Sequence, residues 1–441
     1  MVLFEKIKHV CLSNKVYDFI IKPFDEIIYP VISKEELQKE REKEKIPFNK
    51  IANISDLCNK EWKGIVNELQ SSFSLTEENF HRKNWEFIQI LYILKQTGAL
   101  FPENRGLAIG AGREVILYYL TYKIREIIGI DLYEGYFQGG EDLSDVPEHP
   151  QKYLPFPYNE KRLKLMKMDA LDIDFKNESF DFVFSASSIE HFGSNRKIFK
   201  SSEEIYRVLK PGGLLIITTE LKLNKLGKNI PNTKIFKLEK LINLFEKTGF
   251  RLYKKNIDIK IEKEMLDNWV KLSAEINKLP HVILRYFTTI FSSFSLVLIK
   301  SGNKVKYGTW SGFDKIEKLK YKGEIEVMLQ DKENLTENSE IGFSIKLKNN
   351  SNFKWFVEGG SHRIAIGIKL LDLNNKIIND AFDELKIPKD LDIGESIVFN
   401  ATIKNNLRKG KYRLFFDLKR EIITWFSEKG SSPFLIDIEI V

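Results

Sequence analysis

Two glycines and a carboxylate have the types and the spacing of a nucleotide-cofactor site. Gly110 and Gly112 lie in Arg105-Gly-Leu-Ala-Ile-Gly-Ala-Gly-Arg-Glu114, where an apolar run breaks into a glycine turn. Asp131 ends a second apolar run, Glu126-Ile-Ile-Gly-Ile-Asp131, about twenty residues later. A glycine turn lets a ligand approach the backbone closely, and a carboxylate at the end of the next strand can bind a ribose diol. These residues predict a cofactor-binding loop between two strands.

The elements that must position these residues continue along the chain. Met168-Asp169-Ala170 comes next, and Phe180-Asp-Phe-Val-Phe-Ser185 is predicted to be a further buried strand. Arg207-Val-Leu-Lys-Pro-Gly-Gly213 then leads into the strand Leu214-Leu-Ile-Ile-Thr-Thr-Glu220. Open parallel sheets bind ligands beyond the carboxyl ends of their strands, so Ser185 and Glu220 are expected at that edge.

This order of elements resembles the class I S-adenosylmethionine-dependent methyltransferases over residues 84 to 300. In that family a Gly-x-Gly-x-Gly loop follows an acidic residue, an acid ends the second strand, an Asp-Ala pair flanks adenine, and Leu-Lys-Pro-Gly-Gly precedes the fifth strand. The resemblance implies an α/β fold with a Rossmann-like doubly wound sheet and S-adenosylmethionine as the cofactor. It assigns cofactor binding to Ala108, Gly110, Gly112, Glu114, Asp131, Leu132, Asp169, Ala170 and Ser185.

Two positions depart from the family pattern. Ala108 stands where an acidic residue commonly precedes the loop, and Glu114 replaces the third glycine. We predict that Glu114 supplies the missing charge and meets the amino group of the methionine moiety. The alternative is a carboxylate that only stabilises the start of the following helix.

Three polar residues are candidates for the acceptor side of the site. His191 is the predicted general base, because an imidazole titrates near neutral pH and can take a proton from a hydroxyl as the methyl group arrives. Packing or hydrogen bonding in the first turn after the strand is its alternative role. Glu190 and Glu220 are predicted to bind the acceptor. The alternatives are a capping box formed by Ser187 and Glu190, and a loop-solvating role for Glu220.

Composition and charge favour a soluble cytoplasmic enzyme. The 441 residues include 69 basic and 62 acidic side chains, so the net charge of +7 is a mild bias and does not indicate nucleic-acid binding. The two cysteines, Cys11 and Cys58, provide neither a disulfide framework nor a zinc site. No feature of the sequence predicts an oligomeric state.

Two apolar segments are candidates for membrane contact. Met1 to Ile32 is interrupted by charges and lacks a cleavage pattern, so it is a poor signal peptide. Val282 to Ile299 contains Arg285 and is too short to span a bilayer; its end, from Phe294, is predicted to be the last strand of the sheet. Contact with a membrane surface through Lys22 or Arg285 is the less favoured alternative.

The chain is predicted to contain four regions: a helical N-terminal region 1–83, a methyltransferase domain 84–300, a linker 301–322 and a β-sandwich 323–441. In the first region, the charged run from Ser33 to Lys45 is predicted to be a solvent-exposed helix. The segment from Trp85 to Gly98 has apolar residues at helical spacing and a glycine stop. It is predicted to be a helix that covers one face of the sheet.

From Gly323 onward the apolar period changes to two. Four segments show it: Ile341 to Leu347, Ile397 to Ile403, Tyr412 to Leu418 and Phe434 to Ile440. This pattern predicts an antiparallel sandwich of about seven strands. Its aromatic residues resemble those of immunoglobulin-like sandwiches appended to bacterial surface-polysaccharide enzymes. Trp355, Tyr412 and Trp425 are expected to be core anchors rather than platforms that stack on sugar rings.

Together these features predict an S-adenosylmethionine-dependent methyltransferase that O-methylates a saccharide or surface-glycan precursor. The saccharide follows from the sandwich resemblance and from the lack of a basic stripe with interleaved aromatics. Two alternatives remain open. One is a methyltransferase of a lipid quinone or a small-molecule metabolite. The other is a glycan-binding scaffold whose methyltransferase domain binds the cofactor poorly because of Ala108 and Glu114.

Overall fold

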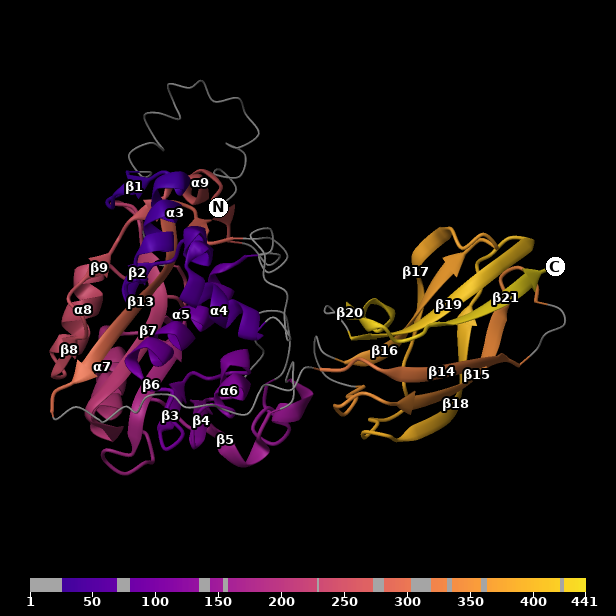
Figure 1. Ribbon diagram of the computed structural model, residues 1–441, viewed down its shortest axis with the longest axis horizontal. Helices are drawn as coiled ribbons and strands as arrows, with labels where there is room; N and C mark the ends of the chain where they lie inside the picture. Colours follow the sequence, from indigo (N-terminus) through magenta and orange to yellow (C-terminus); the bar gives the residue numbers. More distant parts are fainter. Residues whose placement is uncertain are drawn as a thin grey trace, which may run out of the picture. The chain divides into compact units, whose positions relative to one another are not determined.

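The computed structural model describes residues 26–69, 80–134, 143–153, 158–227, 230–272, 281–302, 319–330, 335–357, 363–420 and 424–441. They form two compact units, coloured indigo to salmon and orange to yellow in Figure 1. The first unit contains most of the chain up to Lys315, and the second contains Ile316–Val441. The predicted linker lies largely outside the described residues.

A mainly parallel sheet forms the centre of the first unit. Its parallel strands are β3 (Arg105–Ile109), β4 (Glu126–Asp131), β5 (Leu163–Lys167), β6 (Phe180–Ala186) and β7 (Leu209–Lys222). They lie in the order β5-β4-β3-β6-β7, and β13 (Thr289–Lys300) is antiparallel beside β7. β6 is buried along its whole length, as expected for a strand covered on both faces. The predicted Rossmann-like sheet is confirmed.

Helices cover both faces of this sheet. α5 (Arg82–Thr97) and α6 (Val115–Leu120) lie on one side, and α7 (Asn195–Val208) and α8 (Leu238–Glu246) lie on the other (Figure 1). α5 confirms the helix predicted from Trp85 onward. Gly98 ends it with a φ of 76°, a left-handed conformation that glycine adopts at low cost.

The N-terminal region contributes a strand to the same sheet. It contains β1 (Val31–Ile32), α3 (Lys34–Lys43), β2 (Asn49–Ile51), the 3-10 helix η2 (Ile54–Cys58) and α4 (Lys60–Leu69). β2 pairs with β13. α3 confirms a helix in the charged run, but its predicted exposure is wrong for one face. Arg41 is 1% exposed and its guanidinium pairs with Asp56 and Asp258, because a buried charge must be partnered.

The apolar segment from Val282 to Ile299 forms strands. β12 (Ile283–Tyr286) and β13 pair as an antiparallel hairpin, and β13 confirms the predicted last strand. Within the described ranges, no helix has the length and apolar character needed to cross a bilayer. Lys22 lies outside the described residues.

The remaining short elements are β8 (Phe250–Leu252), β9 (Ile257–Asp258), β10 (Ile261–Glu262), α9 (Lys263–Asp267), β11 (Val270–Lys271), η4 (Pro150–Lys152), η5 (Glu160–Arg162) and η6 (Ile189–His191).

Two antiparallel sheets form the second unit. One contains β14 (Gly323–Leu329), β15 (Glu340–Asn349) and β18 (Ser396–Lys404). The other contains β17 (Ile377–Leu385), β16 (Ile364–Leu371), β19 (Gly410–Arg420), β20 (Thr424–Trp425) and β21 (Phe434–Ile440). The 3-10 helix η9 (Ser427–Lys429) lies between β20 and β21 in the chain. Both sheets contribute to one core, in which the rings of Phe343 and Phe416 meet edge to face. The predicted antiparallel strands are confirmed.

The tryptophans of this unit have different environments. Trp355 is 0% exposed and its indole N–H donates to the Ser351 hydroxyl, so it is a core anchor as predicted. Trp425 is only partly buried, and the Lys369 ammonium lies 4.2 Å from its ring centroid. The hydroxyl of Tyr412, also partly buried, donates to the Arg408 carbonyl.

Candidate functional site

The glycine turn after β3 is held by its neighbours. The amides of Gly110 and Ala111 both donate to the Ile130 carbonyl in β4, at 2.9 and 3.0 Å. From the loop after β6, the Ser188 hydroxyl donates to the Gly110 carbonyl at 2.9 Å. The turn is therefore fixed at the carboxyl ends of three adjacent strands, where open parallel sheets bind their ligands.

Gly110 and Gly112 both adopt the left-handed conformation, with φ of 65° and 47°. A Cβ atom at Gly110 would lie 2.4 Å from the Ser188 Cβ, so a side chain here would force the turn away from that loop. A Cβ atom at Gly112 would meet nothing within 4 Å. Gly110 is thus required by the internal packing of the protein, whereas Gly112 borders open space at the site.

Asp131 lies next to the turn and remains partly exposed. Its Oδ2 accepts the Gly112 N–H at 3.0 Å, and its Oδ1 accepts the Tyr133 N–H at 3.4 Å. The Tyr133 hydroxyl in turn donates to the Gly112 carbonyl at 3.0 Å. The carboxylate predicted to bind ribose therefore also fixes the conformation of the glycine turn.

Other predicted cofactor positions lie near Asp131 with different exposure. Ala108 is fully buried in β3, whereas Leu132 is 49% exposed just beyond β4. The Met168 N–H donates to the Asp131 carbonyl at 2.9 Å, which brings the chain after β5 against the end of β4. Asp169 then accepts the Leu171 N–H at 2.9 Å, and Ala170 beside it is buried. Asp131, Leu132, Asp169 and Ala170 thus share one edge of the sheet.

Glu114 is a buried carboxylate on the glycine turn. Its Oε1 lies 3.2 Å from the Lys83 ammonium of α5, and its Oε2 has no hydrogen-bond partner among the described residues. The side chain makes no capping hydrogen bond to α6, although Glu114 is the N-cap residue. Burial raises the pKa of Glu114 to about 7, and the charge of Lys83 opposes that rise. A buried carboxylate oxygen that lacks a donor suits a ligand ammonium.

Glu190 and Glu220 lie together beneath the acceptor edge, and Arg82 joins them. The Arg82 guanidinium lies 2.8 Å from Glu220 Oε1, and the Thr219 hydroxyl donates to Glu190 Oε2 at 2.8 Å. The capping box predicted for Ser187 and Glu190 is therefore wrong. Ser188, not Ser187, is the N-cap residue of η6, and it makes no side-chain cap because its hydroxyl donates to the Gly110 carbonyl. The Glu190 carboxyl accepts from Thr219 in β7 instead.

The two glutamates have opposite protonation behaviour. Burial raises the pKa of Glu190 well above its usual value, and the charge of Glu220 raises it further. Burial also disfavours the charged form of Glu220, but Arg82 and a hydrogen bond with Glu190 outweigh burial and lower the pKa of Glu220. Of the two carboxyl groups, Glu190 therefore holds a proton more readily than Glu220 does.

His191 follows Glu190 in η6 and is exposed. Its Nδ1 lies 3.1 Å from the Asn232 carbonyl oxygen. Because a carbonyl only accepts hydrogen bonds, the proton is assigned to Nδ1, which leaves a lone pair on Nε2. This is the tautomer that a general base requires. Ser185, which is buried in β6, has a hydroxyl without a hydrogen-bond partner among the described residues.

Three residues of α5 that the sequence analysis did not identify hold the site together. Arg82 also donates to Glu86 at 3.0 Å and to the Ser187 hydroxyl at 3.3 Å. Lys83 donates to the Ala186 carbonyl at 2.6 Å. Two cations in the first turn oppose the helix dipole unless carboxylates partner them. The adjacent cations Arg82 and Lys83 at the start of a helix are therefore the sequence signal that could have indicated buried carboxylate partners.

Comparison with known proteins finds a family match and relatives that each cover part of the chain. The family described as "Methyltransferase domain" matches residues 107–217. Phosphoethanolamine N-methyltransferase 2 of Caenorhabditis elegans is 34% identical over 98 residues, which cover 21% of this chain and 22% of that protein. Sterol 24-C-methyltransferase of Pneumocystis carinii is 38% identical over 79 residues, 17% of this chain and 20% of that protein. The chain spans about a fifth of the length of these curated relatives.

A solved structure, the YcgJ protein of Bacillus subtilis, covers 48% of this chain and 98% of its own, with 14% identity and a TM-score of 0.34. The family match and the strand order define a class I S-adenosylmethionine-dependent methyltransferase domain. S-adenosylmethionine is the methyl donor of this class. Two observations fit that cofactor: Gly112 borders open space, and Glu114 on the same turn has a buried oxygen without a donor among the described residues.

Proposed function

We propose that the protein transfers a methyl group from S-adenosylmethionine to a hydroxyl of a saccharide or surface-glycan precursor. When bound, the cofactor supplies a methyl group on a sulfonium, which a nucleophile can displace in line. Asp131 would bind the ribose hydroxyls, Asp169 and Ala170 would flank the adenine, and Glu114 would receive the ammonium of the methionine moiety.

One observation carries the acceptor side of the proposal: Nδ1 of the exposed His191 lies 3.1 Å from the Asn232 carbonyl oxygen, so in the neutral imidazole Nε2 is the nitrogen that can take a proton. The charges of His191 and Glu220 are close enough to influence each other, because His191 contributes to the lowered pKa of Glu220. When Nε2 takes a proton from the acceptor hydroxyl, the Glu220 carboxylate stabilises the resulting imidazolium. An acceptor oxygen that loses a proton is consistent with a hydroxyl.

Glu190 and Glu220 are 1% and 2% exposed. Their direct contact with an acceptor stays a prediction, and their burial favours a second role. Arg82 stabilises the charged form of Glu220, and that charge in turn acts on His191. The second unit supports the saccharide class through its resemblance to sandwiches of surface-polysaccharide enzymes.

The proposal is tested by incubating the full-length protein with methyl-labelled S-adenosylmethionine and a panel of saccharides, lipid quinones and small metabolites. We expect label on a sugar hydroxyl, identified by mass spectrometry of the product. His191→Ala should lower kcat by about a hundredfold or more, as expected when a general base is removed, while cofactor affinity is retained. Label found only on a quinone or an amine, or an unchanged kcat in His191→Ala, would contradict the proposal.

A further inference from the structure

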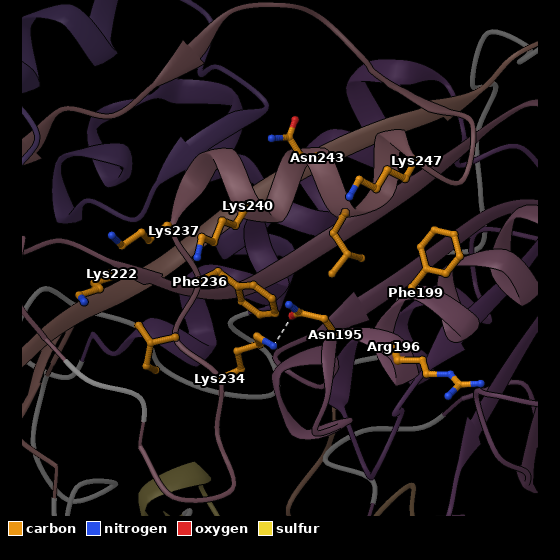
Figure 2. Close-up of a pocket in the computed structure, with 12 residues that line it drawn as sticks. Asn195, Arg196, Phe199, Lys222, Lys234, Phe236, Lys237, Lys240, Asn243 and Lys247 are labelled. Atoms are coloured by element: carbon orange, nitrogen blue, oxygen red, sulfur yellow. Dashed lines mark hydrogen bonds between the residues drawn. The ribbon is translucent and has the colours of Figure 1, made fainter.

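One cavity in the first unit is lined by cations. It lies between the start of α7, the helix α8 and the segment that leads into α8 (Figure 2). Its volume is about 790 Å³, within the range of roughly 300–1,000 Å³ typical of ligand pockets. Half of the twelve lining residues are basic, namely Arg196, Lys222, Lys234, Lys237, Lys240 and Lys247. No carboxylate is among the described residues that line it.

The positive charge of this cavity is not neutralised within the described part of the chain. Arg196, Lys237, Lys240 and Lys247 have no ion-pair partner there. The Lys234 ammonium donates to the Asn195 side-chain carbonyl, and the Lys222 ammonium donates to the Gly227 carbonyl, so both hydrogen-bond partners are neutral. Figure 2 shows Lys240 and Lys247 extending from α8 toward the same hollow as Lys234.

Nearby positive charges lower the pKa of two of these lysines. Burial lowers the pKa of Lys222, and the charge of Lys237 lowers it further. Burial and the charge of Lys240 do the same to Lys234. Each lysine thus carries its charge at a cost that a bound anion would offset.

The backbone adds to this positive potential. α7 has 14 residues and begins at Asn195, which lines the cavity. α8 has 9 residues, and its N-cap is Lys237, which also lines the cavity. Because Lys247, the C-cap of α8, lines the cavity as well, only the start of α7 adds the positive end of a helix dipole, which favours a phosphate.

The cavity adjoins the acceptor edge of the site. The Lys234 N–H donates to the Glu190 carbonyl at 2.9 Å, and the Phe236 N–H donates to the Glu220 carbonyl at 2.9 Å. The segment that contributes Lys234, Ile235, Phe236 and Lys237 to the cavity is therefore hydrogen-bonded to both glutamates that underlie His191. A ligand held by the lysines would extend from a position next to the proposed methyl acceptor.

We propose that this cavity binds the phosphate or diphosphate group of a phosphorylated ligand. Several lysine ammonium groups and the N-terminus of α7 provide donors to phosphate oxygens. Phe199, Ile235 and Leu244 line the same cavity and offer apolar contact to the rest of the ligand. The identity of this ligand as the methyl acceptor rests on the proposed function. The binding of phosphate by the cavity is independent of that function.

The test is calorimetric titration of the full-length protein with inorganic pyrophosphate. The wild-type protein should bind it, and Lys237→Gln/Lys240→Gln should bind it at least about tenfold more weakly, a factor of ten being 1.4 kcal/mol. Lys60→Gln/Lys63→Gln removes the same charge from α4, which does not line the cavity, and should bind like wild type. Absence of binding to wild type, or equal weakening in both variants, would overturn the proposal.

A second arm identifies the source of the phosphate. The protein is mixed with phosphatidylcholine vesicles with and without phosphatidylglycerol, in the presence and absence of pyrophosphate. Binding that pyrophosphate displaces supports a lipid-borne phosphate, and pyrophosphate binding without vesicle binding supports a water-soluble phosphorylated ligand. Pyrophosphate binding without any methyl transfer would contradict the proposed function and leave the phosphate site standing, so the two failures are distinguishable.

Discussion

The two units differ in how they treat buried polar groups. In the second unit, Asn349 is fully buried, yet its amide donates to the Phe353 and Leu391 carbonyls and its oxygen accepts the Ser351 N–H. In the first unit, buried oxygens of Glu114 and Ser185 lack a hydrogen-bond partner among the described residues, and both lie near the strand ends. Most buried polar groups that serve only the fold are satisfied within it. Glu114 and Ser185 lie where open parallel sheets bind their ligands, which makes their unpartnered oxygens candidates for ligand contact.

One ion pair from each unit gives a further comparison, in the exposure of the carboxylate. Arg413 and Asp437 pair at 2.6 Å across neighbouring strands of the second unit, with the carboxylate 55% exposed. Arg82 pairs with Glu220 at 2.8 Å, with that carboxylate 3% exposed. Solvent screens the first pair and not the second. The buried pair therefore lies where chemistry is proposed, and the exposed pair lies on the surface of the second unit.

Removal of Arg82 should have the largest effect. Arg82→Met leaves Glu220 and Glu86 buried without their shared cation, which should lower the free energy of unfolding by on the order of 3 to 5 kcal/mol. The measurement is urea denaturation of the full-length protein. Arg413→Met is the matched control in the second unit, and its transition should not shift. Equal transitions for wild type and Arg82→Met would show that the buried network does not stabilise the first unit.

Loss of Asp131 should be next in size. Asp131→Ala removes the carboxylate predicted to bind two ribose hydroxyls and also releases the Gly112 amide. S-adenosylmethionine affinity should fall by on the order of 2 to 4 kcal/mol, measured by calorimetry. Asp174→Ala, at an exposed position, should bind like wild type. An unchanged affinity in Asp131→Ala would rule out its assignment to the cofactor.

Two open left-handed glycines, one from each unit, allow a direct test of one unit against the other. Gly112 has a φ of 47° and Gly394 a φ of 80°, and a Cβ atom at either would meet nothing within 4 Å. Alanine at each position should cost a similar 1 to 2 kcal/mol of strain, roughly the price of a left-handed residue. Only Gly112→Ala should weaken S-adenosylmethionine binding, because only its methyl group enters the proposed cofactor space. Equal cofactor affinities of the two variants would contradict this placement.

The smallest expected effect is a change in pH dependence. The pKa of Glu114 is about 7, so its carboxyl becomes charged as pH rises through that value. If this carboxylate receives the cofactor ammonium, wild-type affinity for S-adenosylmethionine should rise relative to Glu114→Gln over the same range. Calorimetric titrations at several pH values give the comparison. Parallel profiles would assign Glu114 to its ion pair with Lys83 alone.

Local patterns predicted much of the fold because their causes are local. The glycine turn, Asp131 and the alternating strands of the second unit follow from conformation and periodicity within short segments. The Ser187–Glu190 capping box failed because Thr219, on the neighbouring strand, offers Glu190 a better-placed hydroxyl. Arg41 was expected in solvent because its partner Asp258 is 217 residues away.

The lysine cavity escaped prediction for the same reason. Arg196 and Lys247 are far apart in sequence, and only the packing of α7 and α8 brings their side chains to one hollow. The density of lysines between Lys222 and Lys247 is the signal that the sequence offers. These lysines are not evenly spaced along the sequence, so they do not have the pattern of a nucleic-acid-binding stripe.

The carboxyl ends of β3, β4 and β5 are expected to bind S-adenosylmethionine despite Ala108, with Glu114 supplying the charge that Ala108 lacks. Calorimetric titration of the full-length protein with S-adenosylmethionine tests it directly. We expect saturable binding with one cofactor per chain, weakened in Asp131→Ala and unchanged in Gly394→Ala. Absence of binding by the folded wild-type protein, or equal binding by all three proteins, would contradict the claim and favour a scaffold in which the methyltransferase domain no longer holds its cofactor.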